Sequence, residues 1–209
     1  MKTVLCYGDS NTWGYLATEG ERLARWERWP GVLQRELGDD VHVIEEGLNG
    51  RTTAFDVPEE PDRNGLAFLP AALESHAPVD ILLLFLGVND LFLPFPLTAW
   101  RVAHAVGALV DVARRSEWGP GGGPPAVVVT VPPPFGDLGE NRAWSPHGEE
   151  ETTHLGEEFR TMATEHECEV IDLTESVAFA VPDGIHFDAD GHRRIGMLMA
   201  ASLRGMLST

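Results

Sequence analysis

Residues 81–86, Ile-Leu-Leu-Leu-Phe-Leu, form the unbroken apolar run that most restricts how this chain can fold. A strand with one face in water alternates polar and apolar side chains, whereas a strand covered on both faces is apolar throughout. The run is also far shorter than the roughly 20 apolar residues that a membrane-spanning helix needs. It therefore predicts a central strand of a parallel sheet, with helices on both faces.

Other short apolar segments have the character of strands, and longer amphipathic segments separate them. The expected strands cover residues 3–7, 41–45, 80–86, 126–131 and 169–173. The expected helices cover residues 29–37, 65–76, 97–115, 149–166 and 188–207. Strands that alternate with helices form parallel sheets covered on both sides. We therefore expect a single α/β domain over residues 1–209, with a central five-stranded parallel sheet between two layers of helices.

The charge and the cysteines restrict the partners of this chain. Thirty-three acidic and 15 basic residues give a formal charge of −18, which repels nucleic acid and anionic membranes. Lys2 leads directly into an apolar strand without the pattern of a secretion signal, so we expect a cytoplasmic protein. Cys6 and Cys168 are the only cysteines; both are expected to be buried free thiols in strands, as in a reducing compartment.

Four polar blocks lie where the expected sheet places its functional edge. Ser10 follows the first strand in Gly-Asp-Ser, Gly50 follows the second, and Asn89 follows the third in Gly-Val-Asn-Asp. The fourth block, Asp183 to His186, precedes the last helix. Because the carboxyl ends of parallel strands meet at one edge of a sheet, we expect all four blocks to come together there.

These residue types together suit acyl transfer. A nucleophilic serine needs a base for its proton and a group that orients the base, and His186 and Asp183 supply these roles for Ser10. The backbone N–H groups of Ser10 and Gly50 and the amide of Asn89 are neutral donors for the oxyanion. Alone, Ser10 would be read as a helix N-cap and His186 as an ordinary half-buried histidine. Because the sequence also supplies an orienting acid and oxyanion donors, we favour catalytic roles for Ser10 and His186.

The ordered blocks resemble the SGNH hydrolases, also called the GDSL family. The Ser, Gly, Asn and His of that family correspond by position to Ser10, Gly50, Asn89 and His186, and Asp183 completes the Asp-x-x-His pattern. The Thr-Trp-Gly after the serine and the Asp-Gly-Ile-His-Phe block are similar to the mycobacterial arylesterase and acyltransferase subgroup. This resemblance implies a flavodoxin-like fold, a homo-oligomer, and a serine esterase that hydrolyses short-chain carboxylic esters and can transfer acyl groups to alcohols. The partner is then a small-molecule ester, and the mechanism needs no cofactor.

The substrate pocket is expected around the serine block. Asn11 stands where the family usually has Leu, and a polar residue there alters the expected shape of the pocket. We expect Asn11, Trp13, Asn49 and Phe92 to line this pocket. The alternatives for residues 91–96, which include Phe92, are core packing and a subunit contact.

Several other polar residues have simpler interpretations. Asp188, Asp190 and His192 lack the spacing of a calcium loop and lie where a helix begins, so we expect capping and no metal. Asp9 and Asp90 are expected to be structural acids, with Asp90 anchoring the loop that bears Asn89. Arg51 is expected to be a structural ion-pair partner.

Two alternative functions stay open at this point. A carbohydrate deacetylase, acting on acetylated sugars such as acetylxylan, would use the same residues and mechanism. A non-catalytic flavodoxin-like binding module would hold a phosphate or a flavin in the loop after the first strand. That loop has Gly8 and Gly14 but no glycine-rich cradle, and the module would leave Asp183 and His186 without a role.

Overall fold

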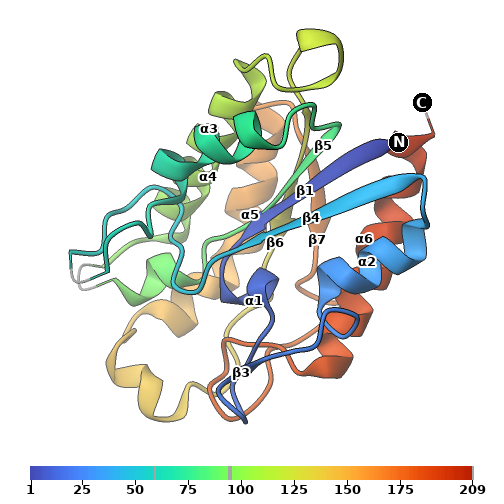
Figure 1. Ribbon diagram of the computed structural model, residues 1–209. Helices are drawn as coiled ribbons and strands as arrows, with labels where there is room; N and C mark the ends of the chain where they lie inside the picture. The colour runs from blue at the N-terminus through green and yellow to red at the C-terminus, as the bar shows by residue number, and fades with distance from the viewer. Residues whose placement is uncertain (59, 94–95, 209) are drawn as a thin grey trace.

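The computed structural model describes residues 1–58, 60–93 and 96–208, and a five-stranded parallel sheet forms its centre (Figure 1). The strand order is β4-β1-β5-β6-β7, and every neighbouring pair is parallel. The strands are β1 (Lys2–Gly8), β4 (Val41–Gly47), β5 (Ile81–Phe85), β6 (Ala126–Val131) and β7 (Glu169–Asp172). The predicted α/β class and five-stranded parallel sheet are therefore confirmed.

Helices cover both faces of the sheet, as the apolar run predicts (Figure 1). One layer contains α3 (Gly65–Ser75), α4 (Ala99–Arg114) and α5 (Gly148–Glu165), and the other contains α2 (Trp29–Leu37) and α6 (Ala189–Leu207). Within β5, Leu82 and Leu84 belong to the first core, whereas Leu83 and Phe85 belong to the second. All four are at most 1% exposed, and each contributes about 1.5–3 kcal/mol by burial.

The one-turn helix α1 (Ser10–Trp13) begins at the serine, where the end of the first strand allows a helix to start. The other short elements were not expected from the sequence, among them the two-stranded antiparallel pair β2 (Tyr15–Leu16) and β3 (Glu21–Arg22). Three 3₁₀-helices complete the set: η1 (Asn89–Phe92), η2 (Pro120–Gly122) and η3 (Gly139–Ala143). Elements this short carry no full period of apolar residues, so a pattern-based reading misses them.

One expectation about the cysteines is wrong. Cys6 is fully buried in β1, but Cys168 lies just before β7 and is only half-buried. The chain turns at Glu167, which has a φ of 49°, so the strand begins one residue too late to include Cys168. Burial raises the pKa of Cys6 well above its usual value and that of Cys168 to about 11, so both thiols stay protonated.

The register of the sheet aligns the strand ends that precede the polar blocks. Gly8 at the end of β1 pairs with Gly47 at the end of β4 and with Phe85 at the end of β5. The segments that follow these strands therefore leave the sheet at the same edge. None of the described helices is long and apolar enough to cross a membrane.

Candidate active site

Ser10 is the first residue of α1, directly beyond the end of β1. Asp9 caps this helix by accepting a hydrogen bond from the backbone N–H of Asn11 at 2.8 Å. The turn is tight because Gly8 has no side chain: a Cβ there would lie 2.0 Å from Thr12 Oγ1. Ser10 is only 7% exposed, so its hydroxyl is held at the edge of the sheet and is largely shielded from water.

A chain of two short hydrogen bonds joins Ser10 to the other end of the sequence. Ser10 Oγ lies 2.7 Å from His186 Nε2, and His186 Nδ1 lies 2.6 Å from Asp183 Oδ2. The other carboxylate oxygen of Asp183 accepts the backbone N–H groups of Ile185 and His186, at 3.1 and 3.2 Å. The carboxylate therefore both closes its own turn and orients the imidazole.

The charge of Asp183 decides which nitrogen of His186 carries the proton. Burial raises the pKa of Asp183, but hydrogen bonds from the His186 ring and from two backbone N–H groups outweigh this and lower its pKa overall. An ionised carboxylate only accepts hydrogen bonds, so the proton of neutral His186 lies on Nδ1. Nε2 is then free to accept the hydroxyl proton of Ser10.

His186 is also supported across its ring and through its loop. The ring of Tyr15, in β2, packs against the imidazole with 4.7 Å between ring centroids. Gly184 adopts a φ of +71°, and a Cβ at this position would lie 2.6 Å from the carbonyl oxygen of Asp137. The Asp-Gly-Ile-His block thus needs glycine at its second position to fit against the neighbouring loop.

The expected oxyanion donors gather at the same edge of the sheet. Asn89, at the start of η1, directs its amide Nδ2 to the Arg51 carbonyl at 3.0 Å and to Asp9 Oδ2 at 3.3 Å. Gly50 lies in the turn before Arg51 and has a φ of +73°. The backbone N–H groups of Ser10 and Gly50 donate no hydrogen bond to any other described residue. They are therefore available to an external oxygen atom.

The structural roles expected for Arg51 and Asp90 are present. The fully buried Arg51 donates from Nη1 to the carbonyls of Gly8 and Glu46, and so holds the ends of β1 and β4 together. Asp90 accepts the backbone N–H of Thr53 at 3.1 Å and its hydroxyl at 2.5 Å. This contact anchors the segment after β4 to the loop that carries Asn89.

Two buried carboxyl groups next to the site have raised pKa values. Burial raises the pKa of Asp9 to about 6, although the N–H of Asn11 and the positive charges nearby oppose the shift. Burial also raises the pKa of Asp90 to about 6, against hydrogen bonds from Thr53. Both groups therefore gain a proton on mild acidification, which makes the stability of this region sensitive to pH.

Asp90→Asn is expected to change how stability depends on pH. The native carboxyl keeps its proton up to about pH 6, whereas the unfolded chain loses it near pH 4. Between these values the native state binds more protons, so ionisation lowers the free energy of unfolding as pH rises, by about 3 kcal/mol in total. The amide cannot ionise. The free energy of unfolding of Asp90→Asn should therefore rise relative to wild type from pH 4 to 7 in urea titrations, and parallel pH profiles would contradict this account.

The pocket expected from the sequence is only partly correct. Asn11 does not line it: the side chain is fully buried and donates from Nδ2 to the Ile185 carbonyl at 3.0 Å. Trp13 is half-buried, and the guanidinium of Arg22 lies over its ring at 4.8 Å. Asn49 is half-buried beside Gly50, and its Oδ1 atom is buried without a hydrogen-bond partner among the described residues.

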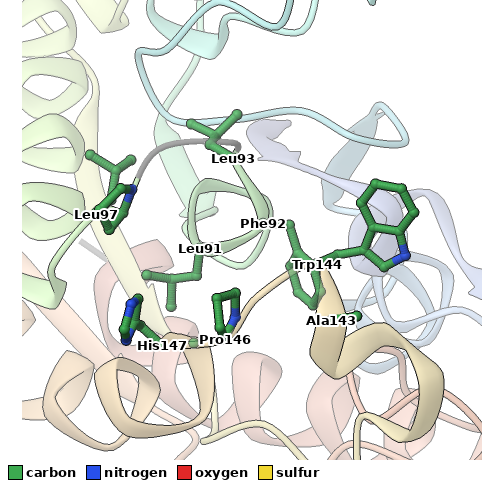
Figure 2. Close-up of a pocket in the computed structure, with 10 residues that line it drawn as sticks. Leu91, Phe92, Leu93, Leu97, Ala143, Trp144, Pro146 and His147 are labelled. Atoms are coloured by element: carbon green, nitrogen blue, oxygen red, sulfur yellow. The ribbon is translucent and has the colours of Figure 1, made fainter.

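Phe92 does line a cavity, of about 680 Å³ (Figure 2). One wall comes from η1 and the residues after it, and the other comes from the segment around Trp144. Ser10 and His186 are not among its lining residues, but Asn89 starts the same 3₁₀-helix that contributes Phe92. Residues 94 and 95 of the expected 91–96 run lie outside the described residues.

The second cavity wall comes from the aperiodic, glycine- and proline-rich segment 135–148, which the sequence predicts to be a long loop over the carboxyl edge of the sheet. Its lining residues are Ala143, Trp144, Pro146, His147 and Gly148. Loops in this position commonly carry binding residues. Trp144 is 74% exposed, and its indole lies beyond Phe92, on the side away from Leu97 (Figure 2).

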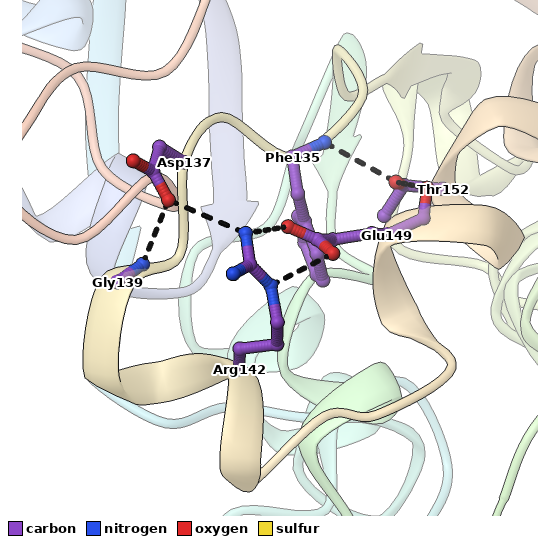
Figure 3. Close-up of polar contacts among 6 residues, drawn as sticks. All are labelled: Phe135, Asp137, Gly139, Arg142, Glu149 and Thr152. Atoms are coloured by element: carbon purple, nitrogen blue, oxygen red, sulfur yellow. Dashed lines mark hydrogen bonds and ion pairs between the residues drawn. The ribbon is translucent and has the colours of Figure 1, made fainter.

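Polar contacts hold the loop that carries this wall (Figure 3). Arg142 binds both carboxylate oxygens of Glu149, at 2.8 and 3.0 Å, and reaches Asp137 at 3.4 Å. The same loop joins the His186 segment, because the N–H of Gly136 donates to the Gly184 carbonyl at 2.8 Å. The loop that supplies one wall of the cavity is thus hydrogen-bonded to the segment that carries His186.

The acids at the start of α6 have the capping roles that the sequence predicts. Asp188 accepts the backbone N–H of Gly191 at 2.8 Å, and Asp190 pairs with Arg193 and Arg194. His192 is fully buried, and burial lowers its pKa to about 3, so it stays neutral. Among the described residues, no group of three or more His, Cys, Asp or Glu is arranged to hold a metal ion.

Comparison with known proteins gives a consistent result. The sequence pattern of the GDSL-like Lipase/Acylhydrolase family matches residues 6–194. An arylesterase of Vibrio mimicus is 30% identical over 64% of this chain, although the match covers only 57% of that protein. The aryl esterase of M. smegmatis is 35% identical with a TM-score of 0.93, over 99% of this chain and all of that one. A carbohydrate acetylesterase family member from Sinorhizobium meliloti is 42% identical with the same TM-score, over the whole of both chains.

Proposed function

The chain belongs to the GDSL-like lipase and acylhydrolase family, and we propose that it is a serine esterase for short-chain carboxylic esters, with aryl and alkyl acetates as its first substrates. The observation that carries this proposal is the hydrogen-bonded chain from Ser10 through His186 to Asp183. A serine that only caps a helix does not need a histidine beside its hydroxyl, and a structural histidine does not need a serine on one nitrogen and a carboxylate on the other. A nucleophilic serine needs the histidine to remove its proton and the carboxylate to orient the histidine.

Acylation follows from this geometry. Ser10 Oγ attacks the ester carbonyl carbon while its proton passes to His186 Nε2, and the carbonyl electron pair moves to the oxygen. The N–H groups of Ser10 and Gly50 donate to this oxyanion, and the amide of Asn89 joins them when it releases its longer contact, to Asp9 at 3.3 Å. When the tetrahedral centre collapses, the bond to the alcohol oxygen breaks and His186 returns its proton to that oxygen. Asp183 stabilises the imidazolium that forms between the two transfers.

Deacylation repeats the sequence with a second nucleophile. Water loses a proton to His186 and attacks the acyl carbon, and the Ser10 ester bond breaks as Ser10 regains the proton. An alcohol in place of water gives acyl transfer instead of hydrolysis. The apolar walls of the cavity at Leu91 and Phe92 disfavour water and suit an alcohol with an aromatic or alkyl group.

Acetylated sugars are the second candidate substrate class. The Sinorhizobium meliloti neighbour, a carbohydrate acetylesterase family member by name, is 42% identical over the whole chain. Aryl and alkyl acetates remain our first choice, because arylesterases of two other organisms are similar to this chain and the cavity is apolar. Trp144 serves either class, because an exposed indole stacks equally well on an aromatic ring or on the apolar face of a sugar.

One comparison of rates tests the proposal. Release of acetate is measured from phenyl acetate and from acetylated xylo-oligosaccharide, and Ser10 is labelled in parallel with an organophosphate probe. We expect Ser10 to be labelled and phenyl acetate to have the higher kcat/KM. A higher kcat/KM for the oligosaccharide would favour the sugar deacetylase. Unlabelled Ser10 in a protein that hydrolyses neither ester would favour the binding module.

Asn89→Ala is expected to lower kcat for phenyl acetate by on the order of 10² to 10³, because one oxyanion donor is lost. The variant also loses the contacts of Nδ2 with the Arg51 carbonyl and with Asp9. Urea unfolding must therefore show a folded protein before kcat is compared. Near-normal turnover in the folded variant would overturn the role of Asn89 in the oxyanion hole.

A further inference from the structure

Asn11 links the nucleophile segment to the segment that carries the base. Its amide Nδ2 donates to the carbonyl of Ile185 at 3.0 Å, across 174 positions of sequence. Ile185 directly precedes His186, and Asn11 directly follows Ser10. The residue after the nucleophile therefore holds the backbone next to the general base.

The His186 segment fixes its own shape without fixing its place. Ala180 donates to the carbonyl of His186 at 2.8 Å, Gly184 donates to the carbonyl of Ala180 at 3.0 Å, and Asp183 closes the turn. All of these contacts lie within the segment between β7 and α6. They would be unchanged if the whole segment moved relative to β1.

The segment is held in place by the Gly136 N–H on the Gly184 carbonyl and by the burial of Phe187 in the core, and α1 links it directly to the nucleophile. Within residues 1–58, 60–93 and 96–208, two hydrogen bonds join α1 to the segment between β7 and α6. One is the bond between Ser10 and His186, which must break and re-form in each turnover. The other is the bond from Asn11 to Ile185, which takes no part in proton transfer and can persist throughout.

The burial of Asn11 indicates that its side chain serves the hydrogen bond to Ile185 rather than the packing of the core. The side chain is fully buried, and its Oδ1 atom has no hydrogen-bond partner within the described part of the chain. An unpaired buried carbonyl costs free energy that leucine, with the same number of side-chain atoms, would not. A residue that is unfavourable for packing alone is typical of a functional position.

We infer that Asn11 is a positioning residue, which holds His186 Nε2 within reach of Ser10 Oγ through the Ile185 carbonyl. The inference rests on the proposed function, in which the distance between these two atoms governs proton transfer. It assigns to Asn11 no contact with substrate.

The test compares Asn11→Leu with a matched control in the same helix. Thr12→Val removes a hydroxyl that is also buried and has no hydrogen-bond partner among the residues that the structure describes, the His186 segment included. We expect Asn11→Leu to lower kcat for nitrophenyl acetate about 10- to 100-fold with KM within about twofold, because small misplacements of a reacting group are costly. Thr12→Val should keep kcat near wild type, and Asn11→Leu should unfold at the same or a higher urea concentration.

Three outcomes would overturn the inference. The first is a wild-type kcat in Asn11→Leu, and the second is an equal loss of kcat in Thr12→Val. The third is a loss of kcat in Asn11→Leu together with unfolding at a lower urea concentration than wild type. A crystal structure of Asn11→Leu provides a reading that does not depend on activity. We expect the Ser10 Oγ to His186 Nε2 distance to exceed about 3.2 Å, beyond hydrogen-bond range. An unchanged distance would overturn the role of Asn11 even if the chain proved not to be an esterase.

Discussion

Ser10→Ala is expected to lower kcat for nitrophenyl acetate by on the order of 10⁶, because the acyl-enzyme can no longer form. In the proposed mechanism the Ser10 hydroxyl is the group that bonds covalently to the substrate. It is also the group that His186 Nε2 contacts, at 2.7 Å, and so the one that the base can deprotonate. The fold should be unaffected, since the remaining cap contacts of α1 come from Asp9. KM for residual turnover should change little, because the oxyanion donors and cavity remain.

A matched serine and a covalent probe make this result specific. Ser75→Ala changes an exposed serine at the end of α3, far along the chain from the site, and should retain full activity. An organophosphate should label wild type and Ser75→Ala but not Ser10→Ala. Residual activity above about 1% of wild type in pure Ser10→Ala would show that another group is the nucleophile, and the proposed function would have to be withdrawn.

The sequence predicts the parts of the fold in which one physical pattern dominates. The apolar run at β5 identifies a strand buried on both faces, and the structure places Leu82 and Leu83 in opposite cores. The blocks after β1, β4 and β5 meet because their strands end in register at Gly8, Gly47 and Phe85. Parallel topology alone is enough to predict that convergence.

The parts that the sequence could not show depend on contacts between distant residues. The burial of Asn11 becomes evident only when the Ile185 carbonyl, 174 positions away, lies against it. Likewise the contact of the Tyr15 ring with His186 becomes evident only when the short β2 strand places the ring there. The cavity wall at Trp144 depends on the contact of Arg142 with Glu149, two surface charges among many. The spacing of apolar residues predicts helices and strands, but it does not predict contacts between residues that are far apart in the sequence.

Asp183→Asn is expected to lower kcat by on the order of 10⁴ with the fold intact. Asparagine can keep Oδ1 on the N–H groups of Ile185 and His186, so the turn is preserved. Its NH₂ group then faces His186 Nδ1, which was 2.6 Å from the carboxylate, and donates to it. The imidazole must place its own proton on Nε2, and that nitrogen can no longer accept the proton of Ser10.

The pH dependence of stability separates this tautomer effect from a loss of structure. Asp183 has a lowered pKa in the folded protein, so its ionised form contributes stability that is present above about pH 4 and lost as the pH falls through the folded-state pKa. Asp183→Asn should lose that contribution yet remain folded at pH 7, with the 10⁴-fold loss confined to kcat. A folded variant within tenfold of wild-type kcat would show that the orientation of His186 rests on Tyr15 and Asn11 rather than on the carboxylate.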